Sequence, residues 1–327
     1  MDAHISKKRI GHMLSYDWIK IIAIAAAAII VWSLLFTMLA TRATIGQTFY
    51  FYYFNDMELK NNEKLNTLDY LKEKNALSYD VLEFTQGSFS DDSQTSQAMA
   101  AWFSAKQGDI LWVSDVKPEP EDGEETFSRL QQFATSYYSI LAPLGEDYVD
   151  DDGKIVKEDY LKTCEKYLAQ FYTDGDFREG NLDAGAVENS FRTRMKKDKR
   201  YKTEAQIAEG IKDETARIEN LRDSYLNVQK ALEVGVLSIK ETKIWQDKNN
   251  DNNVDEDEWK TVRCAFDLSN LTKITDYITN GKDDKSNEGI CLSVFDWAAS
   301  QYDLQFEPIT YLNFILTTYD KSGKLSA

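Results

Sequence analysis

The sequence predicts an α/β protein in which a single N-terminal transmembrane helix precedes an open, mostly parallel sheet lobe. A stretch of 21 uncharged residues near the N-terminus predicts the helix, and alternating strand-like and helix-like segments between residues 48 and 115 predict the lobe. A long helical pattern follows, and then strand-like runs return. With 43% hydrophobic and 13% aromatic residues, the 327-residue chain can bury a core despite a net charge of -17.

The uncharged stretch lies between Lys20 and Arg42 and is long enough, as a helix, to cross a bilayer. A cleaved signal peptide has a shorter apolar core of about 7–15 residues, and "TRATIG" is a poor cleavage site, so we expect an uncleaved anchor. Basic residues are concentrated before the span, which predicts a cytoplasmic N-terminus, a single pass through the cell membrane and an extracellular ectodomain.

The charge of the ectodomain restricts its partners. The segment through Arg42 holds five basic and two acidic residues, so the ectodomain carries -20. Such a surface argues against nucleic acid as a partner.

Short links between strand-like and helix-like segments predict the first part of the lobe. Residues 48–54 ("TFYFYYF"), 79–84 and 108–115 have the apolar and aromatic content of strands, and helices are expected within 55–75 and 95–107. Parallel neighbours cannot be joined by tight hairpins, so this alternation favours a β-α-β-α-β arrangement in a parallel sheet.

The pattern turns helical from about Thr126 to Val234. In its longest segment Thr203 and Gln206 form a capping box, and apolar residues recur at intervals of three, four and seven. A stripe of this kind meets a partner helix or packs on the protein's own core, and we interpret it as an inward face. Beyond Gly235, two strand-like runs flank an acidic stretch, and a late strand and an amphipathic helix follow.

These patterns divide the chain into five parts. They are a cytoplasmic stub (1–20), a transmembrane anchor (21–41), the first part of the α/β lobe (44–125), a helical region (126–235), and a hairpin, late strand and C-terminal helix that complete the lobe (236–327). Three cysteines match no zinc-module spacing. Cys264 and Cys291 lie in strand-like runs that would allow a cross-strand disulfide, but buried free thiols are favoured.

Most hydrolytic chemistry lacks its residues in the ectodomain. Both histidines, His4 and His12, precede the span, so no histidine remains beyond it to act as a general base or as a zinc ligand. The G-x-S-x-G, P-loop and G-x-G-x-x-G motifs do not occur. Carboxylates are abundant, but nothing singles out a pair at the separation that glycoside cleavage needs. We therefore expect a protein that is not an enzyme.

Open α/β sheets bind ligands beyond the carboxyl ends of their strands. The polar residues that follow the predicted strands are therefore the candidate ligand-binding residues: Asn55, Asp56, Gln86, Ser88, Ser114 and Asp115, with Asp296 and Trp297 after the late strand. Each of them also fits an ordinary helix cap or a solvated turn.

The acidic stretch "DKNNDNNVDEDE" (247–258) matches the ligand spacing of a calcium loop. An EF-hand loop supplies oxygens from positions 1, 3, 5, 7, 9 and 12, and those positions fall on Asp247, Asn249, Asp251, Asn253, Asp255 and Glu258. Position 6, where glycine usually makes the turn, holds Asn252, the next most tolerant of a left-handed backbone. Between strands, such an ion would stabilise a hairpin. The alternative is an acidic hairpin tip without an ion.

A basic run, "RTRMKKDKRYK" (192–202), places seven positive charges within eleven residues of an acidic domain. It motivates a second hypothesis, a non-catalytic envelope scaffold that recognises another protein or an anionic cell-wall polymer or lipid surface. The same run is also typical of a solvated helix face.

The arrangement as a whole resembles a known family. "YDWIKII" opens the anchor, the aromatic first strand follows, and then come "AKQGDILWVSD" and a late "GICLSVFDW" before the last helix. Together these segments resemble membrane-anchored extracytoplasmic solute-binding proteins of bacterial ABC importers, which are periplasmic-binding-protein-like. The resemblance implies capture of a solute or peptide for an importer permease or a sensor. That family usually has two lobes and a lipidated cysteine, whereas the first cysteine here is Cys164.

Overall fold

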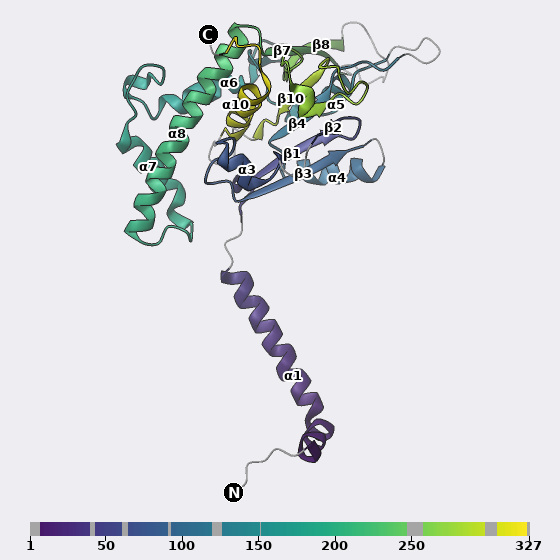
Figure 1. The fold of residues 1–327 in the computed structure, drawn as a ribbon, viewed down its shortest axis with the longest axis vertical. Coiled ribbons are helices and arrows are strands. Elements are labelled where there is room, and N and C mark those ends of the chain that lie inside the picture. Colours follow the sequence, from purple (N-terminus) through teal and green to yellow (C-terminus); the bar gives the residue numbers. More distant parts are fainter. Residues whose placement is uncertain are drawn as a thin grey trace. The chain divides into compact units, whose positions relative to one another are not determined.

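The fold is described from a computed structural model. The structure describes residues 7–39, 43–60, 65–90, 93–119, 126–150, 152–246, 258–297 and 306–325. The chain forms two compact units, Met1–Arg42 and Ala43–Ala327 (Figure 1).

The described residues of the first unit, 7–39, form the helix α1 (Lys7–Leu39) of 33 residues. Within it, Trp18–Leu35 is apolar and long enough to cross a bilayer, and its side chains are exposed throughout. A single N-terminal helix of the predicted kind is therefore present. It begins well before residue 21, because the basic residues that precede the apolar stretch are helical too.

A six-stranded sheet organises the second unit. Its order is β3 (Glu83–Phe89), β1 (Thr48–Phe54), β4 (Ile110–Ser114), β10 (Ile290–Val294), β8 (Trp259–Asp267) and β7 (Ser238–Trp245). The pairs β1–β3 and β1–β4 are parallel, whereas β4–β10, β10–β8 and β8–β7 are antiparallel. Four strands thus run in one direction and β10 and β7 in the other. The predicted mixed α/β fold with a mostly parallel sheet is confirmed in this sense.

Helices cover both faces of the sheet. Strand β1 is buried on both sides, which explains its uninterrupted aromatic run: Phe49 and Phe51 join one core, and Tyr50, Tyr52 and Phe54 join the other. The first core also contains side chains of α3 (Leu68–Glu73), α8 (Glu204–Glu233) and α10 (Glu307–Tyr319). The second contains side chains of α4 (Ser93–Ser104) and α5 (Arg129–Tyr137).

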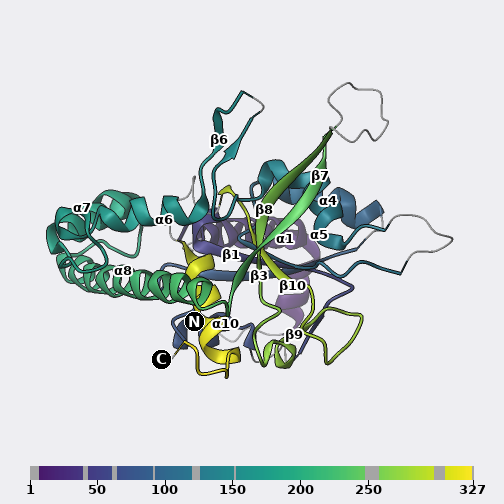
Figure 2. The ribbon, with the colours of Figure 1, turned by 90° about the horizontal axis from the view of Figure 1, so that it is seen from above.

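The helical region contains α6 (Tyr160–Ala169), α7 (Ala184–Arg194) and α8, which Figure 2 shows grouped at one side of the globular unit. Helix α8 begins with the predicted capping box, in which Thr203 accepts from the Gln206 backbone and Gln206 reaches back to the Thr203 backbone. Its apolar stripe is an inward face, because Ile218, Leu221 and Val228 are buried against α10 and the sheet.

Several boundaries differ from the sequence-based expectation. The second strand occupies 83–89, four residues later than the start predicted at 79, because its pairing with β1 begins at Glu83 opposite Thr48. The expected helix within 55–75 is a short strand, β2 (Glu58–Leu59), followed by α3.

Further short elements lie in the described residues. They are the 3-10 helices η1 (Ile45–Gln47), η2 (Tyr138–Ile140), η3 (Thr173–Gly175), η4 (Met195–Lys197) and η6 (Ile274–Asp276), the hairpin of β5 (Tyr148–Val149) and β6 (Ile155–Lys157), and β9 (Ile278–Thr279), which pairs with β2.

Candidate functional site

The sheet topology creates a crevice at the carboxyl ends of β1 and β4. The chain leaves β1 for β3 on one side and then returns to β4 on the other side. The connecting helices α3 and α4 belong to the cores on opposite faces of the sheet. The two connections therefore diverge between β1 and β4, and open α/β sheets bind ligands at such a switch point.

A cavity of about 460 Å³ lies at this position. Four segments line it: the end of β1, the end of β4, the start of α5 and the loop after β9. The lining residues are Asp56, Ser114, Val116, Lys117, Pro118, Glu119, Phe127, Arg129, Gln132, Asn280, Gly281 and Lys282.

Arg129 is held in place at the start of α5. Its Nε lies 3.2 Å from Asp56 Oδ2, and its Nη1 donates to Gln132 Oε1 at 3.2 Å. The guanidinium also lies 5.4 Å from the centroid of the Phe54 ring, within cation–π range. These contacts join α5 to the end of β1 and leave 24% of the Arg129 side chain exposed beside the cavity.

The loop after β9 is fitted closely against the end of β1. Gly281 has a φ of +77°, and a Cβ built there would lie 1.3 Å from the Asp56 carbonyl oxygen, so only glycine fits. Asn280 Oδ1 accepts hydrogen bonds from the backbone N–H groups of Lys282 and Asp283, each at 3.0 Å. The loop is thereby fixed, and Lys282 lines the cavity.

The two polar residues at the end of β4 have different roles. Ser114 is buried and lines the cavity, and its Oγ accepts from the Val116 backbone N–H at 3.2 Å. Asp115 accepts from Ser128 Oγ at 2.5 Å and lies 2.7 Å from Lys240 Nζ. Since Ser128 is the N-cap of α5, Asp115 fixes the start of that helix.

The structure gathers only some of the predicted ligand-binding residues. Asp56 and Ser114 line the cavity, with Asn55 and Asp115 next to them in the chain. Gln86 and Ser88 lie inside β3 and not beyond its end, because that strand runs to Phe89.

The residues that follow the late strand, β10, lie at the opposite end of the sheet from the crevice. Because β10 is antiparallel to β4, Asp296 and Trp297 stand near the amino end of β4, where Trp297 Nε1 donates to the Gly108 carbonyl at 2.8 Å. Asp296 Oδ2 lies 3.7 Å from Lys157 Nζ. Both residues follow the late strand, but they lie at the opposite end of the sheet from Asp56 and Ser114.

Sequence reasoning missed the cationic part of the crevice. Lys117 lies at the start of the acidic stretch 116–125 and Arg129 lies after it, whereas Asn280 and Lys282 follow a strand of only two residues. Only Lys117 follows a strongly patterned strand, and the local signal near Arg129 is Ser128 as a helix N-cap.

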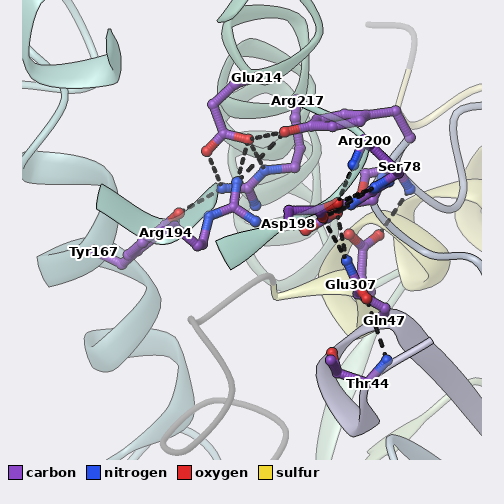
Figure 3. A network of polar contacts seen from close by, with 12 residues as sticks. Thr44, Gln47, Ser78, Tyr167, Arg194, Asp198, Arg200, Glu214, Arg217 and Glu307 are labelled. Carbon is purple, nitrogen blue, oxygen red and sulfur yellow. Dashed lines mark hydrogen bonds and ion pairs between the residues drawn. The ribbon is translucent and has the colours of Figure 1, made fainter. Parts of the chain in front are cut away.

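A second polar cluster joins the helical region to the sheet (Figure 3). Arg194 at the end of α7 lies 2.6 Å from Asp80 and 2.5 Å from Glu214, and Arg217 lies 2.8 Å from the same Glu214. Burial alone would raise the pKa of Glu214, but Arg217 and Arg194 outweigh burial and lower it to about 2. The charges compensate one another inside the protein, which indicates a structural role.

Two of the seven positive charges in the basic run at 192–202, those of Arg194 and Arg200, belong to this cluster. Arg200 pairs with Asp80 and, at 2.7 Å, with Asp198, while Arg194 is almost fully buried. Arg192 pairs with Glu188 at 2.7 Å. The three arginines of the run are therefore engaged within the protein, and they do not form an open cationic surface.

The acidic stretch lies almost entirely outside the described residues, which exclude 247–257. Its flanks are described: β7 and β8 pair with Trp245 opposite Trp259, so the stretch connects the two strands of a hairpin. Glu258 is 2% exposed and accepts from Trp245 Nε1 at 2.9 Å. Among the described residues, no group of three or more potential metal ligands comes together. The three cysteines are buried and free.

Comparison with protein-family models, with curated proteins and with solved structures finds no match to this chain.

Proposed function

We propose that the protein is a membrane-anchored, extracytoplasmic binding protein that captures a small solute or a peptide in the crevice at the carboxyl ends of β1 and β4. The position of that crevice carries the proposal, because a cavity of about 460 Å³ opens at the switch point of the parallel strands. Small-molecule sites typically measure about 300–1,000 Å³ and combine apolar walls with a few convergent polar groups.

Two further observations support a membrane-anchored protein whose binding domain lies outside the cell. The apolar stretch of α1 is suited to anchoring the chain, and the basic residues before it favour a cytoplasmic N-terminus with the sheet outside the cell. The resemblance to ABC-importer binding proteins suggests delivery to an importer permease or a sensor. In this proposal the β-α-β-α-β part is the ligand-binding part, and the protein performs no catalysis, since the ectodomain has no histidine.

A crevice-blocking variant tests the proposal. Gln132 lines the cavity from an exposed position on α5, so Gln132→Trp should fill part of the cavity without disturbing the core. Ser136→Trp is the matched control, because Ser136 is exposed on the same helix but outside the lining. Full-length protein in detergent should show a thermal shift with at least one member of a panel of sugars, amino acids, organic acids and oligopeptides.

The shift should disappear in Gln132→Trp and persist in Ser136→Trp. A panel without any response, or a response that both variants keep, would exclude this crevice as the binding site.

We also propose that calcium stabilises the β7–β8 hairpin through Asp247, Asn249, Asp251, Asn253, Asp255 and Glu258. The antiparallel pairing of the flanking strands supports a hairpin loop with the required spacing. Carboxylates crowded into such a turn repel one another, and a divalent ion would remove that repulsion.

A further inference from the structure

The charged residues around the crevice are unequally paired. Asp56 is neutralised by Arg129 at 3.2 Å, and the neighbouring Asp115 is neutralised by Lys240 at 2.7 Å. The acidic side chains nearest the strand ends therefore already have cationic partners.

Two ammonium groups remain available on the lining. Lys117 has no ion-pair partner within the described part of the chain. Lys282 lies 3.9 Å from Glu119, and both side chains are strongly exposed, at 52% and 89%, so that this pair is weak. Three of the five charged lining residues are basic, in a chain whose net charge is -17.

The rest of the lining complements these charges. Ser114 and Gln132 provide neutral polar groups, whereas Val116, Pro118 and Phe127 provide apolar surface. A cationic ligand would find the Asp56 carboxylate already occupied by Arg129 and would meet two ammonium groups. Among the residues that the structure describes, an anionic ligand would find these ammonium groups paired weakly, for Lys282, or not at all, for Lys117. Charge-assisted hydrogen bonds are the stronger kind.

We infer that the crevice binds a small organic anion, whose charged group lies between Lys117 and Lys282 and whose carbon skeleton lies on the apolar wall. This inference rests on the proposed function and narrows it to one chemical class. Carboxylates and phosphate monoesters both offer negatively charged oxygens that can accept hydrogen bonds from ammonium groups, and the experiment tests both.

The test compares matched pairs of ligands by calorimetry on the full-length protein in neutral detergent. Succinate is compared with succinamide, and glycerol phosphate with glycerol, so that each pair differs mainly in charge. At least one anion should bind at least about tenfold more tightly than its neutral partner, because the lost contacts are charge-assisted. Its affinity should also fall as salt is added.

Variants then assign the binding to the two lysines. The double variant Lys117→Gln, Lys282→Gln should weaken binding of that anion about tenfold or more. Lys285→Gln is the matched control, because Lys285 is exposed on the same loop but lies outside the lining, and it should leave the affinity unchanged.

The possible outcomes distinguish the inferred anion selectivity from the proposed solute binding. Equal binding of charged and neutral partners, or an affinity that the double variant retains, would overturn the inference and leave solute binding intact. Failure of every ligand in these pairs and in the wider panel would overturn both. Preference for the carboxylate or for the phosphate would identify the anionic group.

Discussion

Arg194 contacts two carboxylates while only 8% of its side chain is exposed. Replacing it by methionine keeps much of the volume but removes positive charge from between Asp80 and Glu214. Breaking a buried pair costs about 3–5 kcal/mol, and we expect the lower end, about 3 kcal/mol, because Arg200 and Arg217 still face these carboxylates. Urea denaturation of the full-length protein would measure the loss for Arg194→Met.

Arg192 is the matched control for this substitution. It stands two residues earlier, pairs with Glu188 and is 42% exposed, so Arg192→Met should cost less than about 1 kcal/mol. Equal losses for the two variants would show that the buried cluster stabilises the fold no more than a surface ion pair does.

Asp109 gives the protein an expected pH dependence of stability between about pH 4 and about pH 8. Its carboxylate accepts from the Tyr50 backbone N–H at 2.7 Å. Burial raises the pKa of the Asp109 carboxyl to about 8, although that hydrogen bond opposes the rise, and Glu307 adds to it. The folded protein then keeps a proton that the unfolded chain releases near pH 4. The free energy of unfolding should fall as the pH rises from about 4 to about 8, by at most about 1.4 kcal/mol per pH unit.

Asp109→Asn should flatten this slope, because the amide oxygen can still accept from Tyr50 and carries no charge. Unfolding free energies at about pH 5 and about pH 8 measure the effect, and the gain of the variant over wild type should be larger at the higher pH. An identical slope in both proteins would mean that Asp109 titrates in its ordinary range.

At the scale of the elements, we predict that calcium stabilises the β7–β8 hairpin. An ion that binds the folded loop raises stability by RT ln(1 + [L]/Kd), about 1.4 kcal/mol at ten times Kd. We expect millimolar calcium to raise the melting temperature relative to chelator, and magnesium to substitute poorly because it demands a tighter octahedron. The fluorescence of Trp245 should respond as well, since that ring contacts Glu258.

Asp251→Asn tests the calcium site more cleanly than a substitution of Glu258 does. Glu258 also accepts a hydrogen bond from Trp245, so its replacement would disturb the hairpin even if no ion binds. Asp152→Asn, in the exposed turn between β5 and β6, is the control. Wild-type protein with the same melting temperature in chelator and in calcium would identify the stretch as a solvated hairpin tip.

Strand direction explains which site residues could be predicted from the sequence. The pattern of an individual strand reveals its buried faces but not its direction relative to its neighbours. Asp56 and Ser114 lie at the same end of the sheet because β1 and β4 are parallel, whereas Asp296 and Trp297 follow an antiparallel strand and lie at the other end. Arg129 and Lys282 reach the crevice through the tertiary packing of α5 and of the β9 loop. The N-cap at Ser128 indicates where α5 begins but not where that helix packs.

At the scale of the whole molecule, the buried cysteines make the membrane topology testable. All three native thiols are buried, so a membrane-impermeant maleimide should label the wild-type protein weakly. With the proposed orientation, Ser322→Cys should be labelled on intact cells, because Ser322 is exposed in the second unit, whereas Ala3→Cys should be labelled only after permeabilisation. Labelling of Ala3→Cys on intact cells would show that the N-terminus lies outside the cell, opposite to the proposed orientation.

The place of β1 in the sheet has a mechanical consequence. This strand begins at Thr48, soon after the first unit ends at Arg42, and it is hydrogen-bonded on both sides to parallel neighbours. A pull along the strand from its amino end would strain both ladders in shear, so that many hydrogen bonds resist together and none is unzipped alone. The second unit is thus joined to the first through an interior strand of its sheet, and a pull on that connection loads two ladders of hydrogen bonds at once.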